Sequence, residues 1–248
     1  MSPSERDLVE QTLVSALDAS DVADVTRLTG GASRQTWMAT VDGRAVIAQR
    51  QQPESERDMR VEADVLRAAE SGRVPAPRVL ACVEAPDGVV TLVTGHVAGE
   101  TIARRLLRDD RYASARSRLA AQMGTAMARL HHVDPAHAPG LEPVDPLALY
   151  RDQLDEYGEP HPAFELAFRW LAEHQVDDER VGIVHGDLRL GNVIVDEEGL
   201  AAVIDWELAH LGNPLHDLGW ACVPAWRFGS DLPAAGVGTR EQLLDAYN

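Results

Sequence analysis

The sequence predicts an α+β protein of two lobes, with a small antiparallel sheet in residues 1–98 and mainly helices in residues 99–248. Three observations carry this prediction. Apolar stretches of strand length, separated by turn signals, crowd the first hundred residues. A long alanine- and leucine-rich stretch without proline follows over residues 113–132. No low-complexity linker divides the chain, and 248 residues suffice for two small lobes that share a cleft.

A helix opens the first lobe. Ser2 to Glu5 form a capping-box pattern with proline at the first helical position, and apolar residues follow at helical spacing up to about Asp18. Asp42-Gly43 is a two-residue hairpin signal. A second helix is expected over residues 59–69, ended by Gly72. The strands expected in this lobe cover residues 25–28, 36–41, 45–50, 78–84 and 89–94.

The second lobe begins with the helix over residues 113–132 and a proline-rich loop. Two more helices are expected near residues 147–157 and 163–174, and a last one starts at about Thr239. Three short apolar strands are expected between them, over residues 181–184, 193–195 and 201–204.

The charged residues restrict the function. The chain has 23 basic and 40 acidic residues, a net charge of −17, and no lysine, so every basic residue is arginine. This balance argues against nucleic acid as a partner, because phosphate backbones bind basic surfaces. No apolar run is long enough to span a membrane, and the N-terminus lacks a signal-peptide pattern, so a cytoplasmic location is expected. Any phosphate-binding group must be arginine, backbone amide or metal.

The segment VHGDLRLGNV, from Val184 to Val193, carries groups that phosphoryl transfer needs. Asp187 follows a predicted strand, Asn192 comes five positions later, and Asp205 stands in IDWE after a predicted hairpin. A carboxylate must accept the proton of the attacking hydroxyl, and oxygen ligands must hold Mg²⁺ against the triphosphate. We therefore expect Asp187 to be the catalytic base, and Asn192 and Asp205 to bind the metal.

The spacing from Asp187 to Asn192 is that of the protein-kinase loop H-R-D-x-x-x-x-N, with glycine in place of the arginine. With HGDLRLGN, IDWELAHLGNP and HDLGW, the chain resembles the superfamily of aminoglycoside phosphotransferases and choline kinases. It looks most like the branch related to the phosphotransferase domain of some acyl-CoA dehydrogenases. The resemblance implies a protein-kinase-like two-lobed fold. It also implies transfer of phosphate from ATP, with Mg²⁺, to a hydroxyl of a small molecule, and GTP is not excluded as the donor.

The resemblance also implies nucleotide-binding positions in the first lobe. The family's nucleotide-covering loop corresponds to Gly30–Ser33, where Ser33 would contact a phosphate. Most members carry an ATP-binding lysine on the third strand, and Arg50 is the expected substitute here, with Arg44 as the alternative. Glu62 would pair with this arginine in the nucleotide-bound state.

Other positions follow from the same resemblance. Gly95 and Val97, in the hinge between the lobes, would offer backbone groups to adenine. Arg189 stands where protein kinases often have a lysine for the transferred phosphate, and a structural ion pair is the alternative. Asp217 resembles the aspartate that braces the catalytic loop. Family members usually continue for roughly another 80–100 residues of helix, the scale of a small domain, so the second lobe looks truncated.

Two rival hypotheses stay open. A pseudokinase-like nucleotide-binding module would keep the fold without turnover; the absence of lysine and the short second lobe favour it, whereas Asp187, Asn192 and Asp205 count against it. A metallohydrolase would place His185, Asp187, Asp205 and His210 around a transition metal, for which Asn192 is a poor ligand. The identity of the acceptor and the oligomeric state also stay open.

Overall fold

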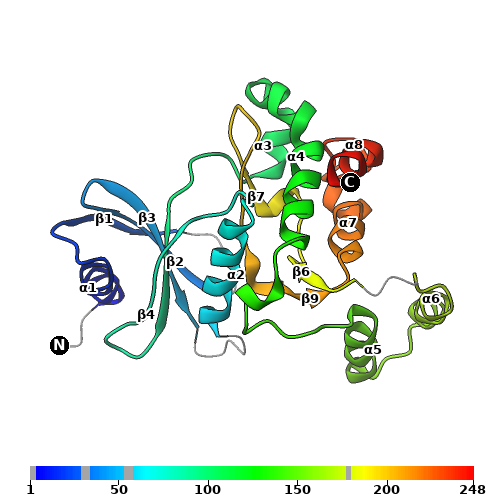
Figure 1. The fold of residues 1–248 in the computed structure, drawn as a ribbon, viewed down its shortest axis with the longest axis horizontal. Helices are drawn as coiled ribbons and strands as arrows, with labels where there is room; N and C mark the ends of the chain where they lie inside the picture. Colours follow the sequence, from blue (N-terminus) through cyan, green and yellow to red (C-terminus); the bar gives the residue numbers. More distant parts are fainter. Residues whose placement is uncertain (1–3, 29–33, 53–57, 177–179) are drawn as a thin grey trace.

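The computed structural model describes residues 4–28, 34–52, 58–176 and 180–248. A five-stranded antiparallel sheet occupies one end of the molecule and helices most of the rest, so the predicted α+β arrangement is confirmed (Figure 1). The strand order is β1-β2-β3-β5-β4. The strands are β1 (Val22–Arg27), β2 (Arg34–Val41), β3 (Arg44–Gln51), β4 (Val79–Glu84) and β5 (Val90–Gly95).

Two helices cover opposite faces of this sheet. Successive strand residues point to opposite faces, and β5 shows both. Leu92 packs in one apolar cluster with residues of α2 (Met59–Ser71), whereas Val93 packs in another with residues of α1 (Glu5–Leu17). The sheet therefore has an α1 face and an α2 face, and Figure 1 shows the second turned towards the helical lobe.

The helical lobe is built around the long helix α4 (Ala113–His131), which packs against α8 (Arg240–Tyr247). Its other helices are α3 (Ala103–Arg108), α5 (Pro146–Tyr157), α6 (Pro162–Glu173) and α7 (Leu215–Ala221). Two small antiparallel pairs cross it, β6 (Gly182–Val184) with β9 (His210–Gly212) and β7 (Val193–Val195) with β8 (Leu200–Val203). The sequence did not predict the short elements α3, α7 and β9.

The connection between β5 and α3 runs along the helical lobe. Glu100 N donates to Val195 O at 2.9 Å, and Val195 N donates to Glu100 O at 3.0 Å, so the connection is bound to β7. Gly99 has a φ of +149°, and a Cβ there would lie 2.5 Å from Ile194. Glycine is therefore required at this close approach. The lobe boundary predicted after residue 98 lies within this connection and stays a prediction.

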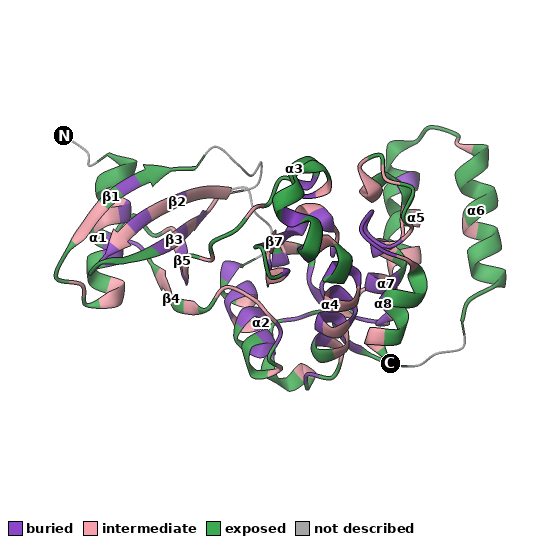
Figure 2. Ribbon diagram, turned by 90° about the horizontal axis from the view of Figure 1, so that it is seen from above, coloured by how far each residue is buried: buried purple, intermediate pink, exposed green. Residues whose placement is uncertain are grey.

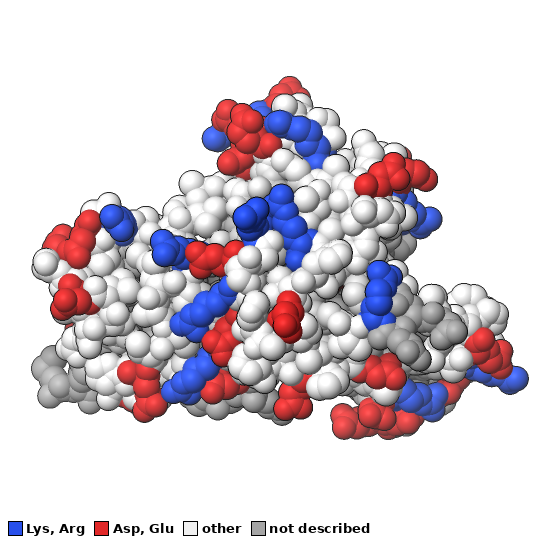
Figure 3. Space-filling view, in the orientation of Figure 1, with Lys and Arg blue, Asp and Glu red and all other residues white. Residues whose placement is uncertain are grey.

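Helix α6 stands apart from the core. It has no buried residue, and Figure 2 shows it separated from the body of the lobe and mostly exposed. On the face drawn in Figure 3, arginine and acidic side chains are interspersed over both lobes. Within the described ranges, no helix combines the length and apolar character needed to cross a bilayer.

Candidate active site

The loop between β6 and β7 holds Asp187 in a dense set of hydrogen bonds. One carboxylate oxygen accepts from Trp220 Nε1 at 2.6 Å and from Arg189 Nε at 3.0 Å. The other accepts from Asn192 Nδ2 at 2.6 Å and from Arg189 Nε at 3.2 Å. The side chain is 14% exposed, so Asp187 is held in place by its neighbours and remains accessible from the solvent.

Arg189 lies beside Asp187 and is itself held from the other side. Its guanidinium carbon is 4.7 Å from the centroid of the Trp226 ring, a cation–π contact. The structure thus places Arg189 in an ion pair with Asp187, at the position where the resemblance implies a contact with the transferred phosphate.

Asp217 braces the start of this loop, as expected. Its fully buried carboxylate accepts from His185 N at 2.8 Å, from Gly186 N at 2.9 Å, and bonds His131 Nε2 at 3.1 Å. Burial alone would raise the pKa of Asp217, but the bond with His131, the neighbouring histidines and the backbone N–H groups hold that pKa below its ordinary value. Asp217 is therefore an anion that fixes the backbone just before Asp187.

His185 connects the loop to Asp205. Its ring bonds Ile204 O through Nε2 at 3.0 Å, and its Nδ1 accepts from Asp187 N at 3.2 Å. Complete burial lowers the pKa of His185, so the ring is neutral and carries its proton on Nε2. Ile204 N in turn donates to Asn192 O at 3.0 Å. Ile204, the residue before Asp205, is thus bonded to both ends of the loop between β6 and β7.

Asp205 adopts an unusual backbone conformation, with φ +66° and ψ +61°. This left-handed region costs free energy for residues other than glycine, and such residues gather at functional sites. Asp205 is exposed in the open site, yet nearby protein atoms displace part of its water and raise its pKa. The carboxylate of Glu207 raises the pKa further, whereas the charge of Arg34 opposes the rise. A cation bound here would stabilise the ionised form of Asp205.

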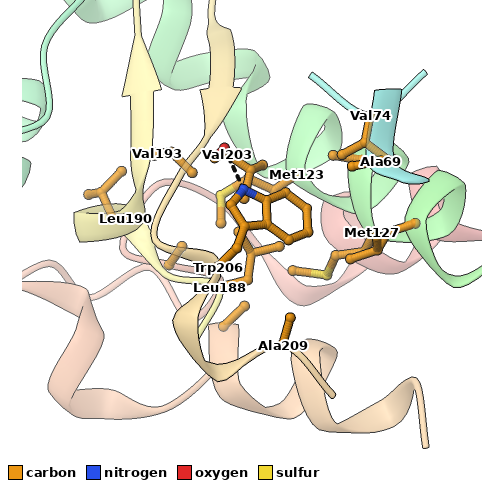
Figure 4. Close-up of a cluster of buried hydrophobic side chains, with 14 of the residues drawn as sticks. Ala69, Val74, Met123, Met127, Leu188, Leu190, Val193, Val203, Trp206 and Ala209 are labelled. Carbon is orange, nitrogen blue, oxygen red and sulfur yellow. Dashed lines mark hydrogen bonds between the residues drawn. The ribbon is translucent and has the colours of Figure 1, made fainter. Parts of the chain in front are cut away.

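A buried tryptophan stabilises both the loop that carries Asp187 and the segment that carries Asp205. Trp206 is 1% exposed, and its Nε1 donates to Val203 O at 3.0 Å. Figure 4 shows its ring between methionines of α4 and apolar side chains of the loop between β6 and β7, with Ala69 of α2 nearby. The residue directly after Asp205 is therefore fixed in the main core.

The donor set suits a hard cation. The amide nitrogen of Asn192 bonds both the main-chain and side-chain oxygens of Asp187, so its carbonyl oxygen is the atom that could bind a metal. Together with the Asp205 carboxylate, it provides the oxygen ligands that Mg²⁺ prefers. In the described part of the chain, no three His, Cys, Asp or Glu side chains come together as a metal site.

The structure does not pair Arg50 with Glu62, which was the expected arrangement. Arg50 lies opposite Gln35 in the β2–β3 ladder, and the Gln35 side chain bonds Glu5 of α1 at 3.0 Å. Arg50 is therefore on the α1 face, where it is buried and forms an ion pair with Asp87. Alternation along the strand, which the sequence analysis did not apply to this residue, is the physical reason.

Glu62 pairs with Arg34 instead, a residue that the sequence analysis did not single out. Arg34 Nη2 also donates to Glu207 Oε2 at 3.3 Å. The side chain of Arg34 is 13% exposed and that of Glu62 is 4% exposed. Arg34 thus joins the sheet, helix α2 and the segment after Asp205 at one point.

The remaining predicted nucleotide contacts lie at the edge of this region or outside the described residues. Gly30, Gly31 and Ser33 fall in the range 29–33, which the structure does not describe. Gly95 ends β5, and Val97 follows two residues later; both are half-buried. Gly95 N donates to Arg78 O at 2.9 Å, so this amide is already engaged.

A cavity of about 730 Å³ adjoins the site between α2, α5 and β9. Gly186 and Glu207, the neighbours of Asp187 and Asp205, form part of its wall. Its other charged walls are Asp58 and Glu142, and no arginine is among its described lining residues. The cavity is therefore acidic and of a size that suits a small molecule.

Comparison with known proteins identifies the family of this chain. The model of the phosphotransferase enzyme family matches residues 24–247. The chain belongs to this family. Mouse acyl-CoA dehydrogenase family member 10 is 34% identical over 98 residues, which cover 35% of this chain and 9% of that protein. Human acyl-CoA dehydrogenase family member 11 is 34% identical over 97 residues, which cover 35% of this chain and 12% of that protein. The chain thus spans about a tenth of the length of these two relatives.

Solved structures of phosphotransferases share the fold. A Ralstonia eutropha protein, described as a candidate aminoglycoside phosphotransferase, superposes with a TM-score of 0.75 at 23% identity, over 97% of this chain and 78% of that one. Aminoglycoside phosphotransferase APH(4)-Ia gives a TM-score of 0.67 at 20% identity, over 97% and 81%. The predicted protein-kinase-like fold and the predicted family, including its acyl-CoA dehydrogenase branch, are therefore confirmed.

Two side chains near the site, those of Trp220 and Arg34, were not predicted from the sequence of this phosphotransferase-family chain. Trp220 lies in the HDLGW string that carried the resemblance, but only the structure shows its bond to Asp187. Arg34 directly follows the residues predicted to form the covering loop, and it lies at the start of β2, where the structure shows every second residue buried from Trp37 on.

Proposed function

We propose that this chain transfers the γ-phosphate of ATP to a hydroxyl group of a small molecule, with Asp187 as base and Asn192 and Asp205 as metal ligands. The observation that supports this most strongly is the shared framework of these three residues. Asn192 bonds Asp187 directly, and Ile204, the residue before Asp205, donates its backbone N–H to Asn192 O. Family membership supports the reaction class.

Asp187 would act on the acceptor hydroxyl. Its carboxylate takes the hydroxyl proton as the acceptor oxygen bonds to the γ-phosphorus, and the bond from that phosphorus to the β–γ bridging oxygen breaks, which releases ADP. Each Asp187 oxygen already accepts two hydrogen bonds in this structure, one of them from Arg189. We expect Arg189 to turn from Asp187 to the transferred phosphate when the acceptor binds, because the hydroxyl needs that position.

Asn192 and Asp205 would hold Mg²⁺, which neutralises phosphate charge when bound. The raised pKa of Asp205, caused by lost hydration and by Glu207, supports a cation as its natural partner. Ser33, Gly95 and Val97 are retained as proposed nucleotide contacts. Aminoglycoside 2'-phosphotransferase-IIIa has been solved with GDP, and a mutant of APH(4)-Ia with ADP, and we propose ATP or GTP for this chain.

We place the acceptor in the acidic cavity beside Gly186 and Glu207. Asp58, Glu142 and Glu207 give its wall a negative charge, and Tyr150 adds an aromatic surface. Such a wall favours a hydroxylated compound that also carries an amine, since opposite charges attract and an aromatic ring binds cations.

The experiment is an acceptor screen with the purified 248-residue chain, ATP and Mg²⁺. The library is divided into hydroxylated amines and neutral hydroxyl compounds of matched size. Acceptor-dependent ADP release and a product 80 Da heavier, the mass of one phosphoryl group, are expected for a member of the amine set. Asp187→Asn serves as the inactive control, and Asp231→Asn, at an exposed position, as the matched active control. ATP that neither binds nor reacts with any acceptor would refute the proposal.

A further inference from the structure

The α2 face of the sheet borders the site, and its basic side chain comes from an unexpected strand. Gln51 lies on this face, because its side chain accepts a bond from Met59 N of α2 at 3.1 Å. Arg34 lies opposite Gln51 in the ladder and shares the face. Along β3, the residues of the same face are Ile47, Gln49 and Gln51, and none carries a charge.

The basic residues of β3 point the other way. Arg44 and Arg50 alternate with the residues above, in phase with the buried Val46 and Ala48 of the α1 cluster. On the described parts of β2, β3 and β5, Arg34 is thus the basic side chain of the α2 face. It reaches both Glu62 of α2 and Glu207, two residues after the proposed metal ligand Asp205.

We infer that Arg34, oriented by Glu62, is the side chain that binds the nucleotide phosphates in this chain, in the role that the sequence suggested for Arg50. The inference rests on the proposed function and specifies one residue of its nucleotide site. Arginine presents five N–H donors in a planar fork, so one edge can keep Glu62 while another contacts phosphate oxygens.

The contacts of the two carboxylates support this division. Glu62 is almost fully buried and belongs to the rigid helix α2, so it fixes the direction of the guanidinium. Glu207 is 33% exposed and bonds Arg34 Nη2 at 3.3 Å. A phosphate oxygen would replace Glu207 at Nη2, because it accepts a shorter, charge-assisted bond. Because Arg34 bonds Glu207, two residues after Asp205, its guanidinium lies beside the segment that carries the proposed metal ligand.

The test measures binding of Mg-ATP and of adenosine by calorimetry. Arg34→Gln removes the charge and keeps much of the side-chain volume. We expect the affinity for Mg-ATP to fall about 10- to 100-fold, which corresponds to the loss of one or two charge-assisted bonds. The affinity for adenosine, which has no phosphate, should stay within about twofold. A purely structural role for Arg34 would weaken both ligands alike.

Two further variants sharpen the result. Arg50→Gln is the matched control, because it removes a buried arginine from the neighbouring strand but on the α1 face, and it should leave Mg-ATP affinity within about twofold of wild type. Arg34→Gln combined with Gln49→Arg returns a cation to the α2 face at a diagonal neighbour, whose side chain lies within reach of Arg34's position, and should restore most of the affinity.

Stability is measured on every variant by thermal unfolding. Should Arg34→Gln unfold at the assay temperature, the double variant Arg34→Gln/Glu62→Gln removes both charges of the pair and keeps their shapes; it should show the same selective loss of Mg-ATP affinity. The inference is overturned when wild type binds Mg-ATP and Arg50→Gln loses that affinity while Arg34→Gln keeps it. Wild type that does not bind Mg-ATP at all contradicts the proposed function itself.

Discussion

Replacing Asp217 with alanine tests how this carboxylate holds the loop between β6 and β7, which carries Asp187. The change leaves three buried donors without their acceptor: the N–H groups of His185 and Gly186, and the ring of His131. Each unsatisfied buried group costs about 1–3 kcal/mol. Some relaxation and water entry are expected, so we predict a loss of roughly 3–5 kcal/mol in the free energy of unfolding. That is a large part of the 5–15 kcal/mol typical of a folded domain.

The assay is urea unfolding followed by tryptophan fluorescence, with the slope of the transition compared between variants. Asp217→Asn should lower the free energy of unfolding less than Asp217→Ala does, because the amide oxygen of asparagine still accepts one of the hydrogen bonds. Some loss remains, because the NH₂ group of asparagine faces a backbone N–H donor. Asp231→Asn, on the exposed surface, should change the free energy by less than about 0.5 kcal/mol. An Asp217→Ala protein within 1 kcal/mol of wild type would refute the reasoning.

Three further predictions concern the same region. Burial lowers the pKa of His185, so below about pH 6.5 the unfolded chain binds a proton that the folded chain does not. The free energy of unfolding should therefore fall on acidification by up to about 1.4 kcal/mol per pH unit. Urea unfolding curves measured over a pH series should show a smaller dependence on pH for His185→Asn. Gly99→Ala should destabilise the protein by about 1–3 kcal/mol in thermal unfolding, because the new Cβ would collide with Ile194; an unchanged transition would contradict the tight approach. Trp220→Phe removes the donor to Asp187 and should lower kcat about tenfold with KM nearly unchanged, whereas an unaltered kcat would show that this bond does not orient the base.

The sequence was most informative where the proposed site residues are close together in the chain. Asp187 and Asn192 lie within one loop, and a short strand pair brings Asp205 beside them, so spacing alone predicted this group of residues. Local bonds determine such a geometry, and the remainder of the protein adds support through Trp206 and Asp217.

The arginine that would bind the nucleotide phosphates was harder to predict, because its position depends on contacts between residues far apart in the chain. The strand that contains Arg50 was predicted at nearly the correct residues, but Ala45 to Ala48 are all apolar, so the alternation of buried residues that the structure shows was not visible in the sequence. Nor did the sequence show which helix covers each face. Successive side chains of a strand point to opposite faces of the sheet. Whether Arg50 or a residue of another strand faces the site therefore depends on which helix covers each face.

The short elements of the second lobe escaped prediction for a related reason. Strand β9 has three residues, and it exists because it pairs with β6 across a long stretch of chain. Helix α7 begins at Leu215 after Pro214, which provides no side-chain cap, and its buried residues include the polar Asp217. Local periodicity is weak in such segments, since tertiary contacts and not propensity stabilise them.

The most direct test of the proposed function compares Asp187→Asn with Asp205→Asn in two measurements on the same samples. Calorimetry gives the affinity for Mg-ATP, and acceptor-dependent ADP release gives turnover. Asp187→Asn should bind Mg-ATP within about twofold of wild type while turnover falls about 10²–10⁴-fold, because a base contributes in the transition state. Asp205→Asn should lose both, because a metal ligand already acts in the nucleotide complex. Equal loss of Mg-ATP affinity in both variants would make Asp187 a metal ligand, and unchanged turnover in both would contradict the phosphotransferase assignment.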